Sequence, residues 1–171
     1  MLGSAGFHKE ALGVFEALPQ GSILNSSRAI ALMECEDYAD ALPLLQADLE
    51  KLSHLETTPM VQYLRATCIG NLSVCLMCLN RNEESLDKME QCRDCKLGLL
   101  GHSHPDYLIS VNNVANILAR LGRVPEALKL YQENKAGMTS TFGQGHPEYL
   151  NFVDNLAECL QQLGQYDDEA Y

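Results

Sequence analysis

The chain has 171 residues, of which 46% are hydrophobic and 20% are charged, so it carries enough apolar material to fold around a core. Its 23 acidic residues outnumber its 12 basic ones, and the net charge of -11 argues against nucleic acid or an anionic membrane surface as a partner. Seven cysteines are too sparse for a disulfide scaffold, which favours a reducing, cytoplasmic location. No signal peptide, lipidation motif or membrane span is expected.

An internal repeat organises the sequence. The pentapeptide HPDYL at 104–108 returns 42 residues later as HPEYL at 146–150. The same shift superposes Gly122 on Gly164 and Asn71 on Asn113, and a further shift of 44 residues extends the pattern back to Ala29. A fixed period of this length indicates stacked units of supersecondary structure.

Each unit is predicted to form two helices joined by a tight turn, because apolar residues recur at helical spacing on both sides of Gly122. We expect one repeat array over 1–171, which is part of a longer array. In chain order it comprises the second helix of a preceding unit at 7–18, helix pairs over 23–52, 62–98 and 106–139, and a first helix with the start of its partner over 148–171, separated by a turn after about residue 163.

Proline, glycine and small residues mark the ends and contacts of these helices. Pro105 and Pro147 fit the first turn of a helix, and Gly101 and Gly143 fit a left-handed helix exit. Small residues recur where the two helices of a pair must approach closely, since bulk there would force them apart. These positions are Ala29, Ser73, Ala115 and Ala157 in the first helices and Ala11, Ala41, Ser85 and Ala127 in the second.

The units resemble tetratricopeptide repeats, specifically the 42-residue variety found in kinesin light chains. The resemblance lies in LGHSHP at 100–105, VNNVA at 111–115 and GRVPEA at 122–127, with further copies in FGQGHP at 142–147 and DNLA at 154–157. It implies an all-α, right-handed superhelical solenoid of antiparallel helix pairs, whose first helices line a concave groove. It also implies a protein-interaction module, an adaptor or scaffold, without implying a motor.

Groove-facing positions are counted from the small residue of each first helix: three and two before it, one after it, and four and five after it. Asn71, Asn113 and Asn155 match the repeating asparagine that contacts bound peptides in proteins of the resembling family. Side-chain amides can bond the backbone of an extended peptide whatever its sequence. The residues predicted to bind a peptide are Asn71, Asn112, Asn113, Asn116, Arg120, Asn155 and Glu158.

The groove is expected to change character along the chain. In the first two pairs its positions include Ile30, Met33 and Val74, a soft apolar surface suited to a hydrophobic anchor. Arg120 is the only cation among the groove positions, whereas Glu34 is one of several acidic residues there. A neutral or basic peptide segment is therefore the expected ligand.

Two other interpretations remain open. A helix-surface asparagine can simply be solvated or can hold neighbouring repeats together. The alternative function is structural: a spacer of a larger repeat protein, or a segment that self-associates through uncapped ends. Cys75, Cys78, Cys92 and Cys95 form two Cys-x2-Cys pairs with 13 residues between them, close to a zinc spacing. Because the repeat places all four within helices, ordinary thiols are the favoured interpretation, and no metal or other cofactor is expected.

No catalytic constellation accompanies the repeats. His104 and His146 recur together before proline at helix starts, where a side chain can cap or pack. His8, His54 and His102 have no partner at a spacing that suggests a triad or metal site. Phosphate loops and nucleophile elbows are missing as well. The sequence therefore predicts a binding protein and not an enzyme.

Overall fold

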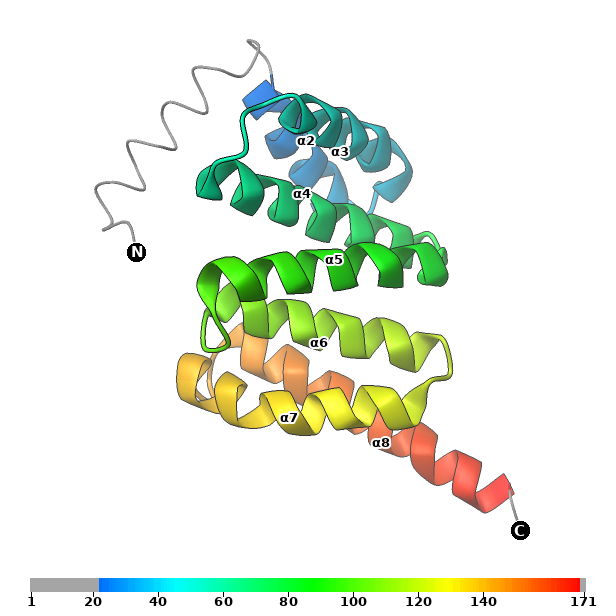
Figure 1. Cartoon of the computed structure of the whole chain (residues 1–171). Coiled ribbons are helices and arrows are strands. Elements are labelled where there is room, and N and C mark those ends of the chain that lie inside the picture. Colours follow the sequence, from blue (N-terminus) through cyan, green and yellow to red (C-terminus); the bar gives the residue numbers. More distant parts are fainter. Residues whose placement is uncertain (1–21, 170–171) are drawn as a thin grey trace. The chain divides into compact units, whose positions relative to one another are not determined.

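The computed structural model describes residues 22–169, and every regular element in that range is an α-helix (Figure 1). The chain divides after Cys95, inside α5, into two compact units. The predicted helix at 7–18 lies outside the described residues. The helices are α2 (Ser22–Glu34), α3 (Tyr38–Ser53), α4 (Pro59–Cys78), α5 (Asn82–Leu100), α6 (Pro105–Arg120), α7 (Val124–Phe142) and α8 (Pro147–Glu169).

The three hairpins formed by α2 to α7 begin and end within about three residues of the bounds predicted for the helix pairs. The prediction is wrong for the last helix, because α8 runs without a break through Gly164 to Glu169 instead of turning after residue 163. Gly164 aligns with Gly122, which does turn the chain, but residues 165–169 contain one apolar residue, Tyr166. Such a segment lacks the apolar face that a second helix would need in order to pack against the first, so the helix continues.

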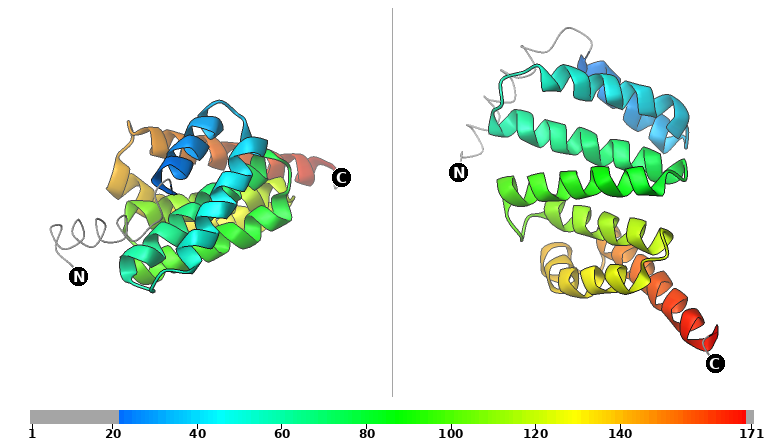
Figure 2. Two further views of the ribbon diagram at one scale, coloured as in Figure 1. Left: turned by 90° about the horizontal axis from the view of Figure 1, so that it is seen from above. Right: turned by 45° about the vertical axis from the view of Figure 1, so that its right-hand side comes forward.

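In unit 1, which ends at Cys95, helices α2, α3 and α4 follow one another as antiparallel neighbours (Figure 2). Their shared core contains Leu45, Leu72 and Leu76. A side chain of α4 bonds to the chain at the end of α3: the Arg65 guanidinium donates to the Leu52 oxygen at 2.6 and 2.9 Å and, just past the helix, to the Leu55 oxygen at 3.1 Å. This arrangement fixes the start of α4 against the end of α3.

The small residues predicted at the helix contacts are fully buried in three hairpins. Ala29 and Ala41, Ser73 and Ser85, and Ala115 and Ala127 each have 0% exposure. The serine pair of α4 and α5 differs from the two alanine pairs only in its two hydroxyl groups. Close approach of the paired helices is therefore a feature of the α2–α3, α4–α5 and α6–α7 hairpins.

The three hairpins share one turn, in which a residue with positive φ follows the first helix. The residue is Glu36 (φ 62°), Asn80 (φ 60°) or Gly122 (φ 75°). In each turn the next N–H donates to a carbonyl five residues earlier, which is the Schellman pattern. The bonds are Asp37 N to Leu32 O at 2.8 Å, Arg81 N to Leu76 O at 2.9 Å and Arg123 N to Leu118 O at 2.9 Å. Gly101 and Gly143 also have positive φ, as predicted for helix exits.

Side chains cap the starts of α3, α4, α6 and α8, whereas α7 begins without a side-chain cap. The Nδ1 atom of His104 accepts from the Asp106 N–H at 3.2 Å, and that of His146 accepts from the Glu148 N–H at 3.1 Å. This confirms that the repeated histidines can cap a helix. Helix α4 begins earlier than predicted because Thr58 caps it, its Oγ1 accepting from the Val61 N–H at 3.2 Å.

Unit 2, from Lys96 onward, packs α6 and α8 against α7. Tyr131 of α7 meets Phe152 of α8 edge to face, with ring centroids 5.9 Å apart, and both side chains are buried. The Cys159 thiol lies 3.7 Å from the Val124 carbonyl oxygen, which it can donate to. These contacts hold α8 against α7 by its inner face.

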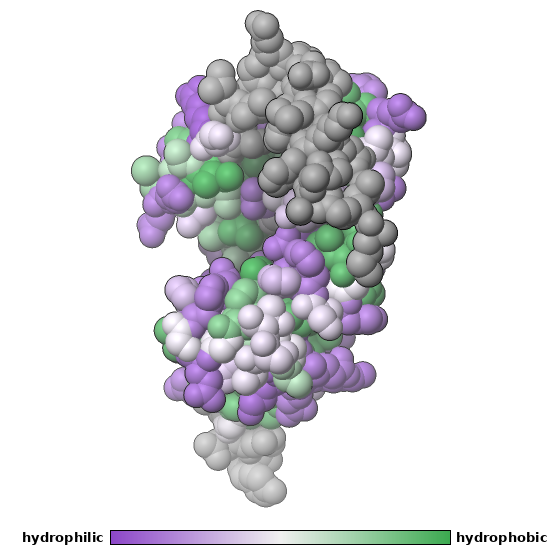
Figure 3. Space-filling view, turned by 90° about the vertical axis from the view of Figure 1, so that its left-hand side faces the viewer, coloured by the Kyte–Doolittle hydropathy of each residue, from purple (hydrophilic) through white to green (hydrophobic). Residues whose placement is uncertain are grey.

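The described helices show no segment long and apolar enough to cross a bilayer. On the face shown in Figure 3, hydrophilic and hydrophobic residues of the described part are interspersed.

Candidate functional site

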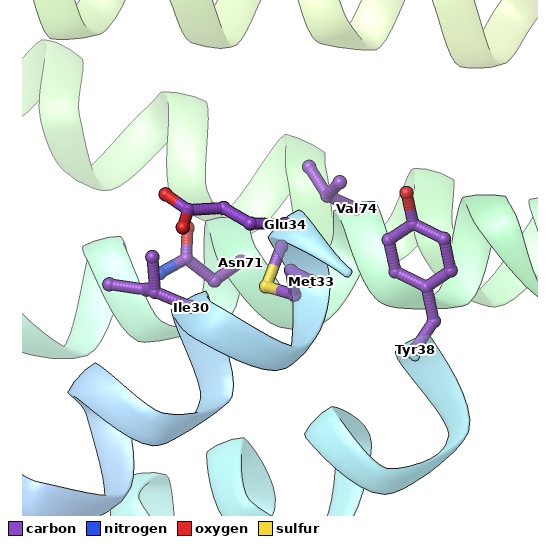
Figure 4. Close-up of a pocket in the computed structure, with 6 residues that line it drawn as sticks. All are labelled: Ile30, Met33, Glu34, Tyr38, Asn71 and Val74. Carbon is purple, nitrogen blue, oxygen red and sulfur yellow. The ribbon is translucent and has the colours of Figure 1, made fainter. Parts of the chain in front are cut away.

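A pocket of about 360 Å³ opens on unit 1 where α2, α3 and α4 meet (Figure 4). This volume lies at the small end of the range for ligand pockets. Its lining residues are Ile30, Met33, Glu34, Tyr38, Asn71 and Val74. All except Tyr38 occupy positions that the repeat assigns to the groove side. The register thus brings the predicted residues of two first helices together around one cavity.

The pocket combines an apolar wall with polar groups at its edge. We call Ile30, Met33 and Val74 the apolar wall; Ile30 is 45% exposed although it is a large hydrophobic residue. In the view of Figure 4, Ile30, Glu34 and Asn71 lie toward one end of the pocket and Tyr38 lies at the other end, with Val74 between them. A ligand here meets hydrocarbon on one side and hydrogen-bonding groups on the other.

Tyr38 is the pocket residue that the groove count did not identify. It is the first residue of α3, so it belongs to the second helix of its pair and enters the pocket only because the α2–α3 turn folds that helix back. The signal available in the sequence was the aromatic residue directly after the turn. A hydrogen bond with the Cys78 side chain raises the pKa of Tyr38 above its ordinary value.

In unit 2, predicted residues of α6 and α8 form a hydrogen-bonded chain. The Asn116 Nδ2 donates to Asn155 Oδ1 at 3.3 Å, and the Arg120 Nε donates to Asn116 Oδ1 at 3.3 Å. Asn113 and Asn155 are half-buried, and Arg120 and Glu158 are exposed. Asn116 and Asn155 therefore contact each other across two first helices, and Asn113 and Asn155 also present polar surface.

Asn112 is a correction to the predicted set. It is 4% exposed, so its side chain offers almost no surface to a ligand. Gly70 holds the same repeat position in α4, where an added Cβ would lie 3.1 Å from the Cys92 Sγ of α5. This position is three residues before the small residue and so lies on the same helix face, which packs against the second helix of the pair.

The four cysteines of the zinc-like spacing are distributed along the α4–α5 hairpin. Cys92 lies opposite Gly70, and the Cys95 Sγ lies 3.7 Å from the Gln62 carbonyl oxygen. Gly70 is five residues from Cys75, about 7.5 Å along the helix axis. Within the part of the chain that the structure describes, no three His, Cys, Asp or Glu side chains gather as ligands for a metal ion.

Comparison with known families identifies tetratricopeptide repeats in both units. One tetratricopeptide repeat family model matches residues 65–106 and another matches residues 107–170, so together they cover more than half of the chain. No curated protein is significantly similar to this sequence.

Solved structures show the same fold at low sequence identity. The nearly identical TPR-like repeats of a putative kinesin light chain from Podosopora anserina superpose with a TM-score of 0.71 and 22% identity, over 87% of this chain and 71% of that one. BtubC (BKLC) from P. vanneervenii gives 0.68 and 16%, over 91% and 62%. A TPR-like protein from Chlorobium tepidum gives 0.66 and 19%, over 86% and 94%. The fold is thus all-α and of the tetratricopeptide-repeat solenoid class, as predicted.

Proposed function

This chain belongs to the tetratricopeptide repeat family, with repeats of the kinesin light chain-like type, and we propose that it binds an extended peptide segment of a partner protein through its first helices. Repeats of this family generally mediate protein–protein interactions, serving as adaptors or scaffolds. The role proposed for this chain is recognition without turnover. Its ligand is a neutral or basic segment.

The observation that carries the proposal is the placement of the predicted residues. Asn71 borders the pocket of unit 1, and in unit 2 Asn113 and Asn155 keep part of their surface accessible. Side-chain amides on first helices can donate to and accept from the backbone of an extended peptide. Arg120 is exposed beside them and can donate to a peptide carbonyl.

The experiment compares partner capture by two triple variants. In the first, Asn71→Leu, Asn113→Leu and Asn155→Leu remove the amides of the first helices. In the control, Gln46→Leu, Gln91→Leu and Gln132→Leu place the same side chain at exposed positions of α3, α5 and α7. Both variants are first shown by circular dichroism to be as helical as the parent chain.

Partners recovered from a cell lysate by the parent and control chains, and absent with the asparagine variant, would place recognition on the first helices. The proposal fails if the asparagine variant retains every partner of the parent chain. Binding would then belong to second helices or repeat ends.

A structural spacer is the second candidate, and the bond between Asn116 and Asn155 favours it because it joins α6 to α8. Asn113 separates the two roles, since in the described part of the chain its side chain forms no hydrogen bond. If Asn113→Leu loses a partner at unchanged stability, the residue serves recognition. If Asn155→Leu lowers the free energy of unfolding and every partner is still captured, the amides hold neighbouring repeats together.

A further inference from the structure

The apolar wall of the unit 1 pocket suits a long side chain that lies along it. Ile30, Met33 and Val74 come from two neighbouring helices, and methionine adapts its shape to a ligand. The pocket is open to solvent on one side, as the 45% exposure of Ile30 shows. Lysine and arginine bury a hydrocarbon stem along such a surface and keep the charged end in water.

The polar edge of the pocket is negatively charged. Glu34 is exposed and takes part in none of the ion pairs found among residues 27–164. The turn that follows adds Glu36 and Asp37, both exposed, and no basic residue occurs between positions 30 and 40. The potential at the pocket mouth therefore attracts cations and repels acidic peptides.

An apolar ligand side chain would fit this pocket less well than a cationic one. It would cover part of the Glu34 carboxylate and remove water from it without replacing the lost hydrogen bonds. An ammonium or guanidinium group at the same place donates to that carboxylate, and the Asn71 amide oxygen on the pocket lining is a further acceptor for it.

We propose that the pocket of unit 1 binds a lysine or arginine side chain of the partner, with the hydrocarbon stem on the apolar wall and the charged end at Glu34. This inference rests on the proposed function and adds to it the residue type that anchors the peptide. The pocket selects a cationic side chain at one position of the peptide, and the amides of the first helices bind the peptide backbone.

The test uses the full chain with methyl groups labelled for NMR. The two probes are acetyl-Gly-Gly-Lys-Gly-Gly-amide and the same peptide with norleucine, which keeps the stem and lacks the ammonium group. Titration is followed at the methyl signals of the apolar wall. Glu34→Gln removes the charge at nearly constant shape. Glu50→Gln is the matched control, because Glu50 is exposed on α3 about 18 Å along the helix axis from Tyr38.

We expect the lysine peptide to bind about two- to five-fold more tightly than the norleucine peptide at low salt, as for other solvent-exposed ion pairs. The preference should disappear in Glu34→Gln, persist in Glu50→Gln and shrink at high salt. Equal or tighter binding of norleucine would overturn the proposal in favour of an apolar anchor.

Titrations in which neither peptide moves the methyl signals would overturn it too. The proposed function is tested separately. If the parent chain captures a partner that the asparagine variant loses, the chain binds a peptide but does not use this pocket for a lysine or arginine. The opposite result is also distinguishable. A lysine preference that depends on Glu34, together with partner capture unchanged by the asparagine substitutions, would support the pocket and contradict peptide binding by the amides.

Discussion

The Oγ atoms of Ser73 and Ser85 lie 2.9 Å apart in the α4–α5 hairpin, and each hydroxyl also reaches the main chain of the facing helix. Ser73 Oγ donates to the Ser85 carbonyl oxygen at 2.7 Å, and Ser85 Oγ donates to that of Ser73 at 2.8 Å. Both residues are fully buried. The α2–α3 and α6–α7 hairpins have alanine at both of these positions, so the serine pair is a polar substitute for an apolar contact.

The first prediction concerns this pair. Ser73→Ala alone should lower the free energy of unfolding by about 1 kcal/mol, because it leaves the Ser85 hydroxyl with a poorer set of partners. The double change to alanine should cost less than the sum of the single changes, since it restores the contact found in the other hairpins. Urea unfolding of the two single variants and the double variant measures the difference. Strictly additive effects would show that the hydroxyl groups are not coupled.

The second prediction concerns Glu36, which has a left-handed conformation that glycine adopts freely. Glu36→Gly should raise the free energy of unfolding by about 1 kcal/mol, because it removes the contact of the Cβ with the following carbonyl. Gly122→Ala should lower it by a similar amount for the same reason. The midpoint of thermal unfolding checks both variants. Glu36→Ala is the control, since it removes the charge and keeps the Cβ; a gain as large as that of Glu36→Gly would attribute the effect to charge.

The third prediction concerns the pH dependence of stability. Burial raises the pKa of Cys68 to about 12 and that of Cys75 to about 11, from an ordinary value of 9.0. Between pH 9 and 11 the unfolded chain therefore loses thiol protons that the folded chain keeps, and the free energy of unfolding falls as pH rises. Below pH 9 these thiols have no such effect.

Thermal unfolding from pH 8 to 11 measures this loss. The variant Cys68→Ala with Cys75→Ala should lose stability less steeply over that interval than the parent chain. Identical slopes would show that other groups control the alkaline transition. A thiol-modifying reagent should react first with the exposed Cys35 at pH 8. It should reach Cys68 and Cys75 only when the chain unfolds.

The fourth prediction concerns the outer face of α8. Leu150, Val153 and Leu160 are 51%, 39% and 49% exposed, and they follow one another at helical spacing with Ala157 between them. We expect copies of this chain to associate through that face at high concentration, because it is an exposed apolar stripe. Leu150→Glu with Leu160→Glu should restore the monomer in sedimentation velocity.

Ala136→Glu with Ser140→Glu places the same charges at exposed positions of α7 and should leave association unchanged. A parent chain that sediments as a monomer at every concentration would contradict the prediction. Dissociation by both pairs of substitutions would show that net charge, and not the α8 face, controls association.

Helices α2 to α7 and the small contacts of their hairpins could be predicted because they depend on residue spacing alone. The predicted contact at Ala157 is wrong, because that residue is exposed on α8. Ala29 and Ala41 are as buried as their repeat positions require. The orientation of Asn112 could not be obtained in this way, since the same register serves both a groove and a hairpin interior. The count also missed Tyr38, whose place in the pocket depends on how the turn returns α3 to α2. Spacing determines helix faces, and three-dimensional packing decides which face stays accessible.

The bond between Asn116 and Asn155 has a consequence for any ligand of unit 2. The two amides already satisfy each other in part, so a peptide that bonds to one of them exchanges an existing hydrogen bond for a new one. Such an exchange yields little net enthalpy. Affinity at this surface then depends on what the exchange adds, such as the charge of Arg120 and the fit of the peptide, and weak, rapidly reversible binding is its natural outcome.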